Sequence, residues 1–592
     1  MRDHKIQAEC QIVTNFLAVQ TPTRNPNKNQ LNLLEDPRTG LATGATRIIL
    51  FCVSWHGLCL HTCIFHYKFC GSIHSDDITT AASTATVAKI TAAKVSVIIT
   101  SMASPPHAVV IPYPAQGHVI PLMEVAHALA DRGFNVTFVN TEFNHARVVA
   151  SMSNGVGSGL GRIRLVAVPD GMAPGEDRNQ LVRLTILMAE FMAPKVEELI
   201  LRSGEAAVDG GKITCMVTDY NVGYWAVDIA RRTGIPVAAV WPASAAVMVT
   251  LLSFPKLIED NIIDGEDGST LGEGTFQLSP DMPLMQSAHL AWNCIGDHDQ
   301  QATLYRLLCD GVRAMEQCDF VICNSFQEAE PASFKLFPNV LPVGPLLTGE
   351  RNGKAVGHFW QPEDHECMSW LDAHTERSVV YVAFGSFTMF NRRQFEELAL
   401  GLELSGRPFL WVVRPDIGHG AVHDYPEGFL DRVCSTGGQG KLVSWAPQQR
   451  VLAHPAVACF VSHCGWNSTM EGVRNGVPFL AWPYFADQFV NQVYISDVWK
   501  VGLKAVADES GVITKEHIAG RVEELMKDAG MRERVEAMKK AAHESIEQGG
   551  SSHGNFDAFA EVMKNAAPHE VSVQDGGASP GNFHTLAEGM KA

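Results

Sequence analysis

The densest set of residues that could do chemistry lies between Trp445 and Gln488. The apolar run Val457–Ser462 is typical of a buried strand, residues 463–468 form the turn after it, and a helix is expected from the end of that turn onward. A strand, a turn containing Gly465 and a helix point free backbone N–H groups at whatever lies above the turn. That arrangement suits a diphosphate.

Side chains around this turn match the other parts of a nucleotide sugar. His463 and Ser468 add donors for phosphate oxygens, and Trp445, which follows another predicted strand, could stack on a flat base. Glu471 lies one turn into the helix and could accept both ribose hydroxyls, while Asp487-Gln488 could hold sugar hydroxyls. Each residue alone has a structural explanation, as a core aromatic, a loop histidine or a solvated carboxylate. Their joint position after successive strands favours a binding site.

The elements that must position these residues alternate between strand and helix in two series. In the first, Ala108–Tyr113 and Asn135–Asn140 are predicted strands around a helix that begins near Pro121 and ends at Gly133. The second series starts at Val379–Phe384. Such alternation predicts parallel sheets with right-handed crossovers, whose ligands bind at the carboxyl ends of the strands. We therefore expect an α/β fold of two Rossmann-like, doubly wound parallel-sheet domains that face a cleft.

The composition of the chain narrows the classes of partner that it can bind. Lys and Arg number 46 and Asp and Glu 64, a formal net charge of −18. Bulk charge of this sign opposes binding to a nucleic-acid backbone or an anionic membrane, so we expect no nucleic-acid partner and no membrane insertion. The 14 cysteines form no CxxC pairs or zinc-type spacing, which favours scattered thiols in a reducing compartment.

The first 101 residues differ from the rest of the chain. The apolar run Ile48–Phe69 is long enough to span a bilayer, but its three histidines make insertion costly. The Ala/Thr/Ser stretch Thr79–Thr100 is similar to an organelle transit sequence, although Asp3 and Glu9 count against that interpretation. Met102 begins a polar lead into the first core strand. We interpret residues 1–101 as a start-site artefact or a disordered extension.

The 44-residue stretch Trp445–Gln488 resembles the plant secondary-product glycosyltransferase box of the UDP-dependent glycosyltransferases, the family 1 enzymes of GT-B fold. The resemblance extends from about Pro106 to Lys564 and is greatest to the plant 83A-type members. It implies inverting transfer of glucose from UDP-glucose to a hydroxyl of a small acceptor, such as a phenolic or other secondary metabolite, to form a β-glucoside. It also implies a cytoplasmic monomer that uses UDP-glucose as co-substrate and needs no cofactor or metal.

Composition and patterning divide the chain into the following expected parts, and the resemblance implies the donor contacts. The domains are 1–101 extension, 102–345 acceptor-binding domain, 346–375 linker, 376–548 UDP-sugar-binding domain, 549–565 a helix that packs back on the N-terminal domain, and 566–592 a disordered tail. The implied donor contacts are Trp445 for uracil, Gln448 and Glu471 for ribose, His463, Asn467, Ser468 and Ser386 for the diphosphate, Trp466, Asp487 and Gln488 for the sugar, and Ala446 as a further contact. A box that ends in Gln implies a preference for glucose.

In the other half, the resemblance places the catalytic pair. His118, in the loop after Ala108–Tyr113, matches the family's catalytic histidine, and Asp219, after Ile213–Thr218, matches its acidic partner. A neutral imidazole can take the proton of an attacking hydroxyl near pH 7, and a carboxylate stabilises the imidazolium. The logic is that of a Ser-His-Asp triad in which the substrate hydroxyl replaces serine.

Several alternatives compete with this interpretation. Asp297-His298-Asp299 has the shape of a DxD metal motif, but three-residue matches are common by chance and the segment is expected to open a helix. A nicotinamide or flavin oxidoreductase is disfavoured because neither first loop carries GxGxxG. A non-catalytic sugar-nucleotide binder is disfavoured by His118 and Asp219, and a membrane-anchored relative by the amphipathic C-terminal helix. The acceptor stays open; its pocket walls are expected in the apolar loops Met172–Asn179, Trp241–Leu252 and Gln277–Trp292.

Overall fold

The computed structural model describes residues 105–151, 160–204, 211–294, 298–346, 359, 364–414, 425–435 and 438–565, together with two short strands nearer the N-terminus. The chain divides into two units, Met1–Ser101 and Met102–Ala592. In the first unit, β1 (Ile48–Cys52) pairs antiparallel with β2 (His61–Phe65), so the apolar run that begins at Ile48 contains strands. The expected disorder of residues 566–592 concerns a tail that lies outside the described residues.

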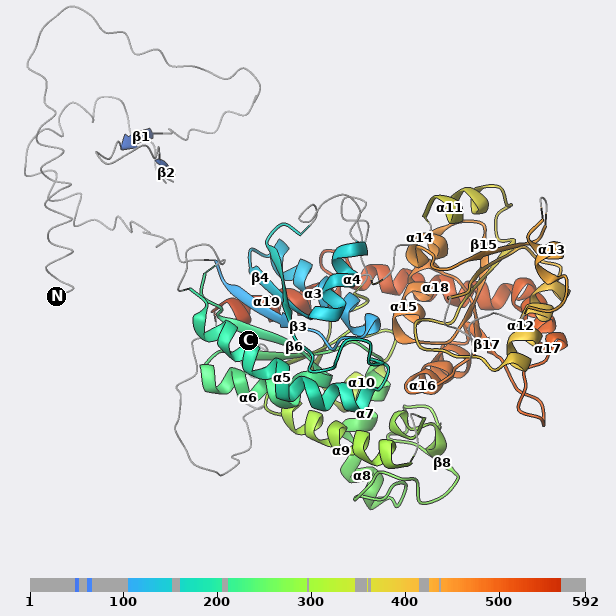
Figure 1. Cartoon of the computed structure of the whole chain (residues 1–592), viewed down its shortest axis with the longest axis horizontal. Helices are drawn as coiled ribbons and strands as arrows, with labels where there is room; N and C mark the ends of the chain where they lie inside the picture. The colour runs from blue at the N-terminus through green and yellow to red at the C-terminus, as the bar shows by residue number, and fades with distance from the viewer. Residues whose placement is uncertain are drawn as a thin grey trace, which may run out of the picture. The chain divides into compact units, whose positions relative to one another are not determined.

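The described part of the second unit is built on two parallel sheets (Figure 1). The first has the strand order β11-β10-β7-β6-β3-β4-β5. Its strands are β3 (His107–Ile111), β4 (Asn135–Thr141), β5 (Ile163–Val168), β6 (Cys215–Asp219), β7 (Val237–Trp241), β10 (Phe320–Cys323) and β11 (Val340–Pro342). The helices of this domain are α3 (Gln116–Asp131), α4 (Glu142–Ser151), α5 (Leu181–Arg202), α6 (Gly223–Thr233), α7 (Ala245–Leu252), α8 (Phe254–Glu259), α9 (His298–Met315) and α10 (Pro331–Leu336).

Both faces of the first sheet are buried, as the apolar strands predict. In β3, Ala108 and Val110 belong to one core cluster and Val109 and Ile111 to another, because successive side chains of a strand point to opposite faces. Helix α3 packs in the first cluster, and α5 and α6 pack in the second.

The second sheet has the order β14-β13-β12-β15-β16-β17, again with every pairing parallel. Its strands are β12 (Val379–Ala383), β13 (Phe409–Val412), β14 (Gly440–Val443), β15 (Val457–Ser462), β16 (Phe479–Ala481) and β17 (Gly502–Lys504). Its helices are α11 (Asp364–Asp372), α12 (Arg392–Leu404), α13 (Phe429–Val433), α14 (Gln448–Ala453), α15 (Trp466–Asn475), α16 (Gln488–Val493), α17 (Lys515–Lys527) and α18 (Ala529–Ile546). The predicted fold class, two doubly wound α/β domains, is confirmed.

The last helix of the described chain, α19 (Ser551–Asn565), packs against the first domain (Figure 1). Its Phe559 ring meets Phe320 of β10 edge-on, at 5.7 Å between centroids. Asp557 accepts from Arg132, which lies just after α3, with an Nε–Oδ1 distance of 2.8 Å. The chain thus crosses back to the first domain after completing the second.

Two local expectations were wrong. The segment 346–375, expected as a linker, contains α11, whose Cys367 and Leu371 are fully buried in the core. Helix α15 begins at Trp466 rather than Thr469, because Gly465 already serves as its N-terminal flanking residue. Asn467 and Ser468 therefore lie in the first turn of a helix, where backbone N–H groups are free of intrahelical partners.

Candidate functional site

The carboxyl ends of two neighbouring strands bring His118 and Asp219 together. Strands β3 and β6 pair in parallel, Asp219 is the last residue of β6, and His118 lies in the first turn of α3. The His118 Nδ1 is 2.8 Å from Asp219 Oδ2. The carboxylate is fully buried, and its other oxygen accepts from the backbone N–H of Asn221 at 2.9 Å. Asp219 is thereby held rigidly against the imidazole.

The surroundings of His118 change its basicity. Burial alone would lower the pKa of His118, but the charge of Asp219 and its hydrogen bond act in the opposite direction, with a further contribution from Asp487. The net result is a pKa of His118 above its ordinary value. The Tyr113 ring meets the imidazole edge-on at 5.3 Å between centroids. This histidine can accept a proton and be stabilised once it has done so.

A proline in α3 frees a backbone carbonyl that a residue of the second domain contacts. Pro121 lies inside α3 and has no N–H, so it leaves the carbonyl of Gly117, four residues earlier, without its intrahelical donor. Asn467 of α15 fills that position, with its Nδ2 2.9 Å from the Gly117 oxygen. The sequence predicted a phosphate contact for Asn467. The structure places its amide on the first turn of α3, which carries the catalytic-base candidate, so the two helix N-termini are held next to each other.

The turn after β15 encloses His463 between two glycines. A Cβ added at Gly385, which follows β12, or at Gly465 would lie 2.4 Å from the His463 Nε2. Gly385 also has φ of +67°, a conformation that glycine adopts most readily. Burial, followed by the positive charge of Arg414, lowers the pKa of His463 to about 4. A hydrogen bond with the backbone of Ala383 opposes this shift without overcoming it, so His463 is a neutral imidazole with a single N–H near pH 7.

A polar network connects the residues predicted to bind the ribose. The Gln448 Nε2 is 2.6 Å from Glu471 Oε2 and 2.8 Å from Ser468 Oγ, and the Gln448 Oε1 accepts from the Tyr381 hydroxyl at 3.0 Å. Burial raises the pKa of Glu471 to about 7, against the opposing hydrogen bonds from Gln448 and Gln449. Tyr381 escaped sequence analysis because it stands in the middle of an apolar strand; the available signal was its buried hydroxyl, which needs a partner.

The last two residues of the box lie at the start of α16: Asp487 directly precedes this helix, and Gln488 is its first residue. Asp487 Oδ2 accepts from Asn491 Nδ2 at 2.8 Å, and burial raises the pKa of Asp487. Gln488 is buried, and its Oε1 accepts from the backbone N–H groups of Tyr484 at 2.8 Å and Phe485 at 3.1 Å. Its carbonyl is therefore committed to its own loop, so only the amide nitrogen remains for a ligand. The predicted contact of Gln488 with the sugar therefore falls to its amide nitrogen.

The other predicted donor residues lie around the same strand ends. Trp466 is buried and its Nε1 donates to the Asn324 carbonyl of the first domain at 2.6 Å, so its side chain joins the domains. Trp445 and Ser386 are half-buried, and Ala446 is buried. All follow strands of the second sheet, except Trp466, which opens α15.

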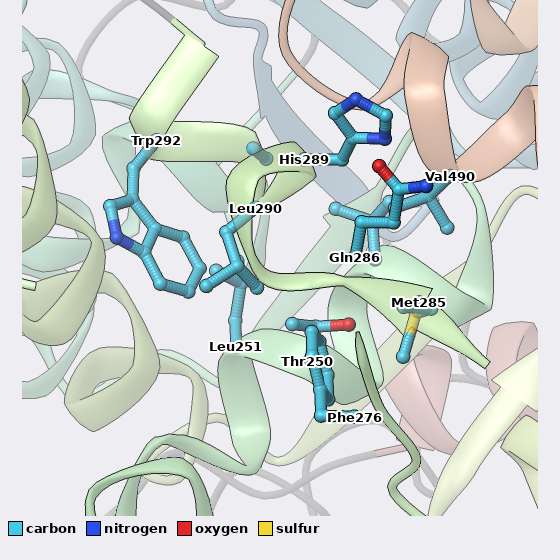
Figure 2. A pocket seen from close by; sticks show the side chains of 11 residues that line it. Thr250, Leu251, Phe276, Met285, Gln286, His289, Leu290, Trp292 and Val490 are labelled. Atoms are coloured by element: carbon cyan, nitrogen blue, oxygen red, sulfur yellow. The ribbon is translucent and has the colours of Figure 1, made fainter. Parts of the chain in front are cut away.

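Figure 2 shows a small apolar pocket between the domains. Its walls are formed by Val247, Thr250, Leu251, Phe276, Met285, Gln286, His289, Leu290, Ala291 and Trp292 of the first domain and by Val490 of α16. The His289 ring stacks on Phe489, the residue after Gln488, at 4.4 Å and 19° between planes. Two of the segments predicted to wall the acceptor site, Trp241–Leu252 and Gln277–Trp292, contribute to it. The first is helix α7 for most of its length rather than a loop.

Asp297 and Asp299 are the two carboxylates of the DxD-like segment. Asp297 lies outside the described residues, and Asp299 is in the first turn of α9. Within the described ranges, no group of three or more His, Cys, Asp or Glu side chains could hold a metal ion. In the same ranges, no helix is both long and apolar enough to cross a bilayer.

Comparison with known proteins places this site in a family. Residues 323–545 match the family model described as UDP-glucoronosyl and UDP-glucosyl transferase. UDP-glycosyltransferase 83A1 of Arabidopsis thaliana is 42% identical over 472 residues, which cover 78% of this chain and 97% of that protein. (R)-mandelonitrile beta-glucosyltransferase of Prunus dulcis is 33% identical over 468 residues, covering 76% of this chain and 95% of that protein.

A solved structure agrees with these sequence matches. Phytolacca americana UGT2, complexed with UDP-2fluoro-glucose and pterostilbene, has a TM-score of 0.62 and 27% identity. The match covers 77% of this chain and 99% of that one. The GT-B fold and the resemblance to plant 83A-type members are confirmed. The chain belongs to the UDP-glucoronosyl and UDP-glucosyl transferase family and is a glycosyltransferase.

Proposed function

We propose that this chain transfers glucose from UDP-glucose to a hydroxyl of a small, largely apolar acceptor, with inversion at the anomeric carbon and with His118 as general base. The observation that carries the proposal is the 2.8 Å bond between His118 Nδ1 and buried Asp219, within the electrostatic influence of Asp487 from the other domain. This arrangement supports a site in which the proton acceptor of the first domain lies beside the second-domain residues predicted to hold the donor sugar.

The hydrogen bond determines how His118 would act. Asp219 accepts a hydrogen bond from the Nδ1–H of His118. The lone pair is therefore on Nε2, which takes the proton of the acceptor hydroxyl. The freed oxygen forms a bond to the anomeric carbon as the bond from that carbon to the diphosphate oxygen breaks, and UDP leaves with the electron pair. Attack from the face opposite the leaving group converts an α-linked donor into a β-glucoside.

The start of α15 supports stabilisation of the departing diphosphate. Its first-turn N–H groups include those of Asn467 and Ser468, and the helix dipole favours negative charge at this end. Neutral His463 adds a donor. We propose that these groups perform the role that a metal ion has in other glycosyltransferases, so transfer continues in excess chelator.

Two observations support the identity of the substrates. The relative from Prunus dulcis is by name a beta-glucosyltransferase, and the box of this chain ends in Gln488. The pocket itself is much smaller than an aglycone, but Trp292, Phe276 and Met285 among its walls make this side of the first domain largely apolar, which supports an apolar acceptor. Pterostilbene, bound in the Phytolacca americana structure, belongs to that chemical type.

A donor and acceptor screen tests the proposal. The purified chain is incubated with UDP-glucose and a panel of apolar phenols, terpenoid alcohols and cyanohydrins, with and without EDTA, and UDP release and product mass are measured. We expect a glucoside whose anomeric proton shows the large coupling of a β-linkage. An α-glucoside would contradict the inverting mechanism, and activity lost in EDTA but restored by Mg²⁺ or Mn²⁺ would contradict metal-independent transfer.

A further inference from the structure

A buried arginine lies behind the candidate diphosphate site and has no role in the mechanism described above. Arg414 follows β13 by two residues and is only 3% exposed. Its Nη1 donates to the carbonyl of Gly385, and its Nη2 donates to the carbonyl of Thr388 at 3.1 Å. Because β12 and β13 are parallel neighbours, the guanidinium at the end of one strand reaches the loop that follows the other.

The two bonds fix the loop that contains Ser386. Ser386 lies between the two bonded carbonyls, and Gly385 is the glycine whose missing Cβ leaves room for His463. A guanidinium presents its donors in a rigid planar fork, so it sets the separation and direction of both carbonyls together. The loop can shift only if at least one of these buried bonds breaks, which costs free energy.

The same guanidinium puts a positive charge beside the Gly385–Thr388 loop. Both acceptors are neutral carbonyl oxygens, and the two bonds fix the direction of the guanidinium. The effect is felt at His463, whose pKa is lowered by burial and then by Arg414. A fixed cation near the start of α15 acts in the same direction as the helix dipole and favours an anion there.

We propose that Arg414 is a positioning residue for the donor diphosphate, which holds the Gly385–Thr388 loop in its binding geometry and adds positive charge behind it. The inference rests on the proposed function, in which this loop and His463 bind the diphosphate of UDP-glucose. Arg414 acts through the loop and through His463, and it differs from the donor contacts expected from the sequence in lying beneath them.

Binding of a ligand series separates this role from a merely structural one. Arg414→Met and Arg414→Lys are compared with wild type and with Arg432→Met, an exposed arginine of the same domain that pairs with Glu403. Affinities for uridine, UMP and UDP are measured by calorimetry, and folding by circular dichroism and thermal melting. We expect Arg414→Met to weaken UDP roughly 10- to 100-fold while uridine changes less than about 2-fold. Arg414→Lys should recover part of the loss, because it restores charge but not the fork.

The outcomes are distinguishable. An equal loss of uridine and UDP affinity in Arg414→Met, or no loss of either, would overturn the inference. Wild-type protein that binds UDP no more tightly than uridine would instead contradict the proposed donor site. If Arg414→Met does not fold, Arg414→Lys decides: a loss confined to the phosphorylated ligands supports the inference, and unchanged or uniformly changed affinity overturns it.

Discussion

His118 belongs to the first domain and His463 to the second, and the charged side chains next to the two imidazoles differ. Each lies at the carboxyl end of a parallel strand, at or just before the start of a helix, with a glycine beside it. Next to His118, the neighbouring strand β6 ends in Asp219; near His463, the loop after β13 carries Arg414. The pKa of His118 is raised and that of His463 is lowered to about 4.

The comparison teaches that a place near a strand end does not by itself decide the chemistry of a histidine. Both imidazoles are penalised by burial, which favours the neutral form. A carboxylate reverses that penalty for His118 and prepares it to hold a proton. A guanidinium reinforces it for His463 and prepares it to donate to an anion while staying neutral. A histidine near a strand end is thus suited to act as a base in one domain and as a leaving-group donor in the other.

The largest effect is expected from His118→Ala. Removing the general base should lower kcat by roughly 10²- to 10⁴-fold, while the Kd for UDP stays within about 2-fold of wild type. Initial rates and calorimetric titration with UDP check both quantities. A variant with normal turnover would show that another group takes the proton, and a matching loss of UDP affinity would show that His118 belongs to the donor site.

Asp219→Asn removes the charge that distinguishes the two histidines. It should lower kcat by about 10²-fold, because the imidazole loses its orientation and its stabilising anion.

The pH dependence of the Asp219→Asn variant gives a sharper test. The base works only when unprotonated, so kcat/KM falls as the pH drops below the pKa of His118. With the carboxylate gone and burial unchanged, that pKa decreases, and the acid limb of the profile should move to lower pH. An acid limb that does not move would show that it reports a different group.

The sequence was sufficient for the architecture and for locating the strand ends around which the candidate site residues lie, for identifiable reasons. Apolar runs such as Val457–Ser462 locate the parallel strands, and polar residues directly after them mark the ligand edge. Hydrogen-bond direction could not be predicted in this way. That Gln488 turns its carbonyl to Tyr484, or that Asn467 reaches the carbonyl released by Pro121, depends on contacts between segments that are distant or tightly turned.

Residues that act from beneath the site were missed for the same reason. Arg414 and Tyr381 lie in or beside strands whose neighbours are apolar, so their pattern is that of a core. Only the three-dimensional pairing of β12 with β13 and β15 shows that their polar ends reach the loops and helices of the site. A buried Arg or Tyr at the end or middle of a strand is the signal to search for such a partner.

His463→Ala tests the donor side of the comparison. The loss of one hydrogen bond to a charged oxygen should weaken UDP about 10-fold and leave uridine binding unchanged. The acid limb of kcat/KM should stay at its wild-type pH, since His463 is already neutral throughout that range. A shift of that limb would mean that the two histidines titrate as a coupled pair.

The smallest effect concerns the choice of sugar, which we expect Gln488 to influence through its amide nitrogen alone. Glucose and galactose differ in the direction of the C4 hydroxyl, and a misplaced epimer that leaves a buried polar group unpaired costs about 1–3 kcal/mol. We therefore expect wild type to favour UDP-glucose over UDP-galactose by roughly 10- to 100-fold in kcat/KM.

Three variants separate the two ends of the Gln488 amide. Gln488→His should narrow the preference by a few-fold, because it changes the donor presented to the sugar. Gln488→Glu retains an acceptor for the N–H groups of Tyr484 and Phe485 but removes the donor, so the melting temperature should stay close to wild type while glucose transfer falls. Gln488→Ala removes both and should lower activity with both sugars. The measurement is a competition between the two donors at fixed acceptor; equal use by wild type would refute the glucose assignment and leave the transferase assignment intact.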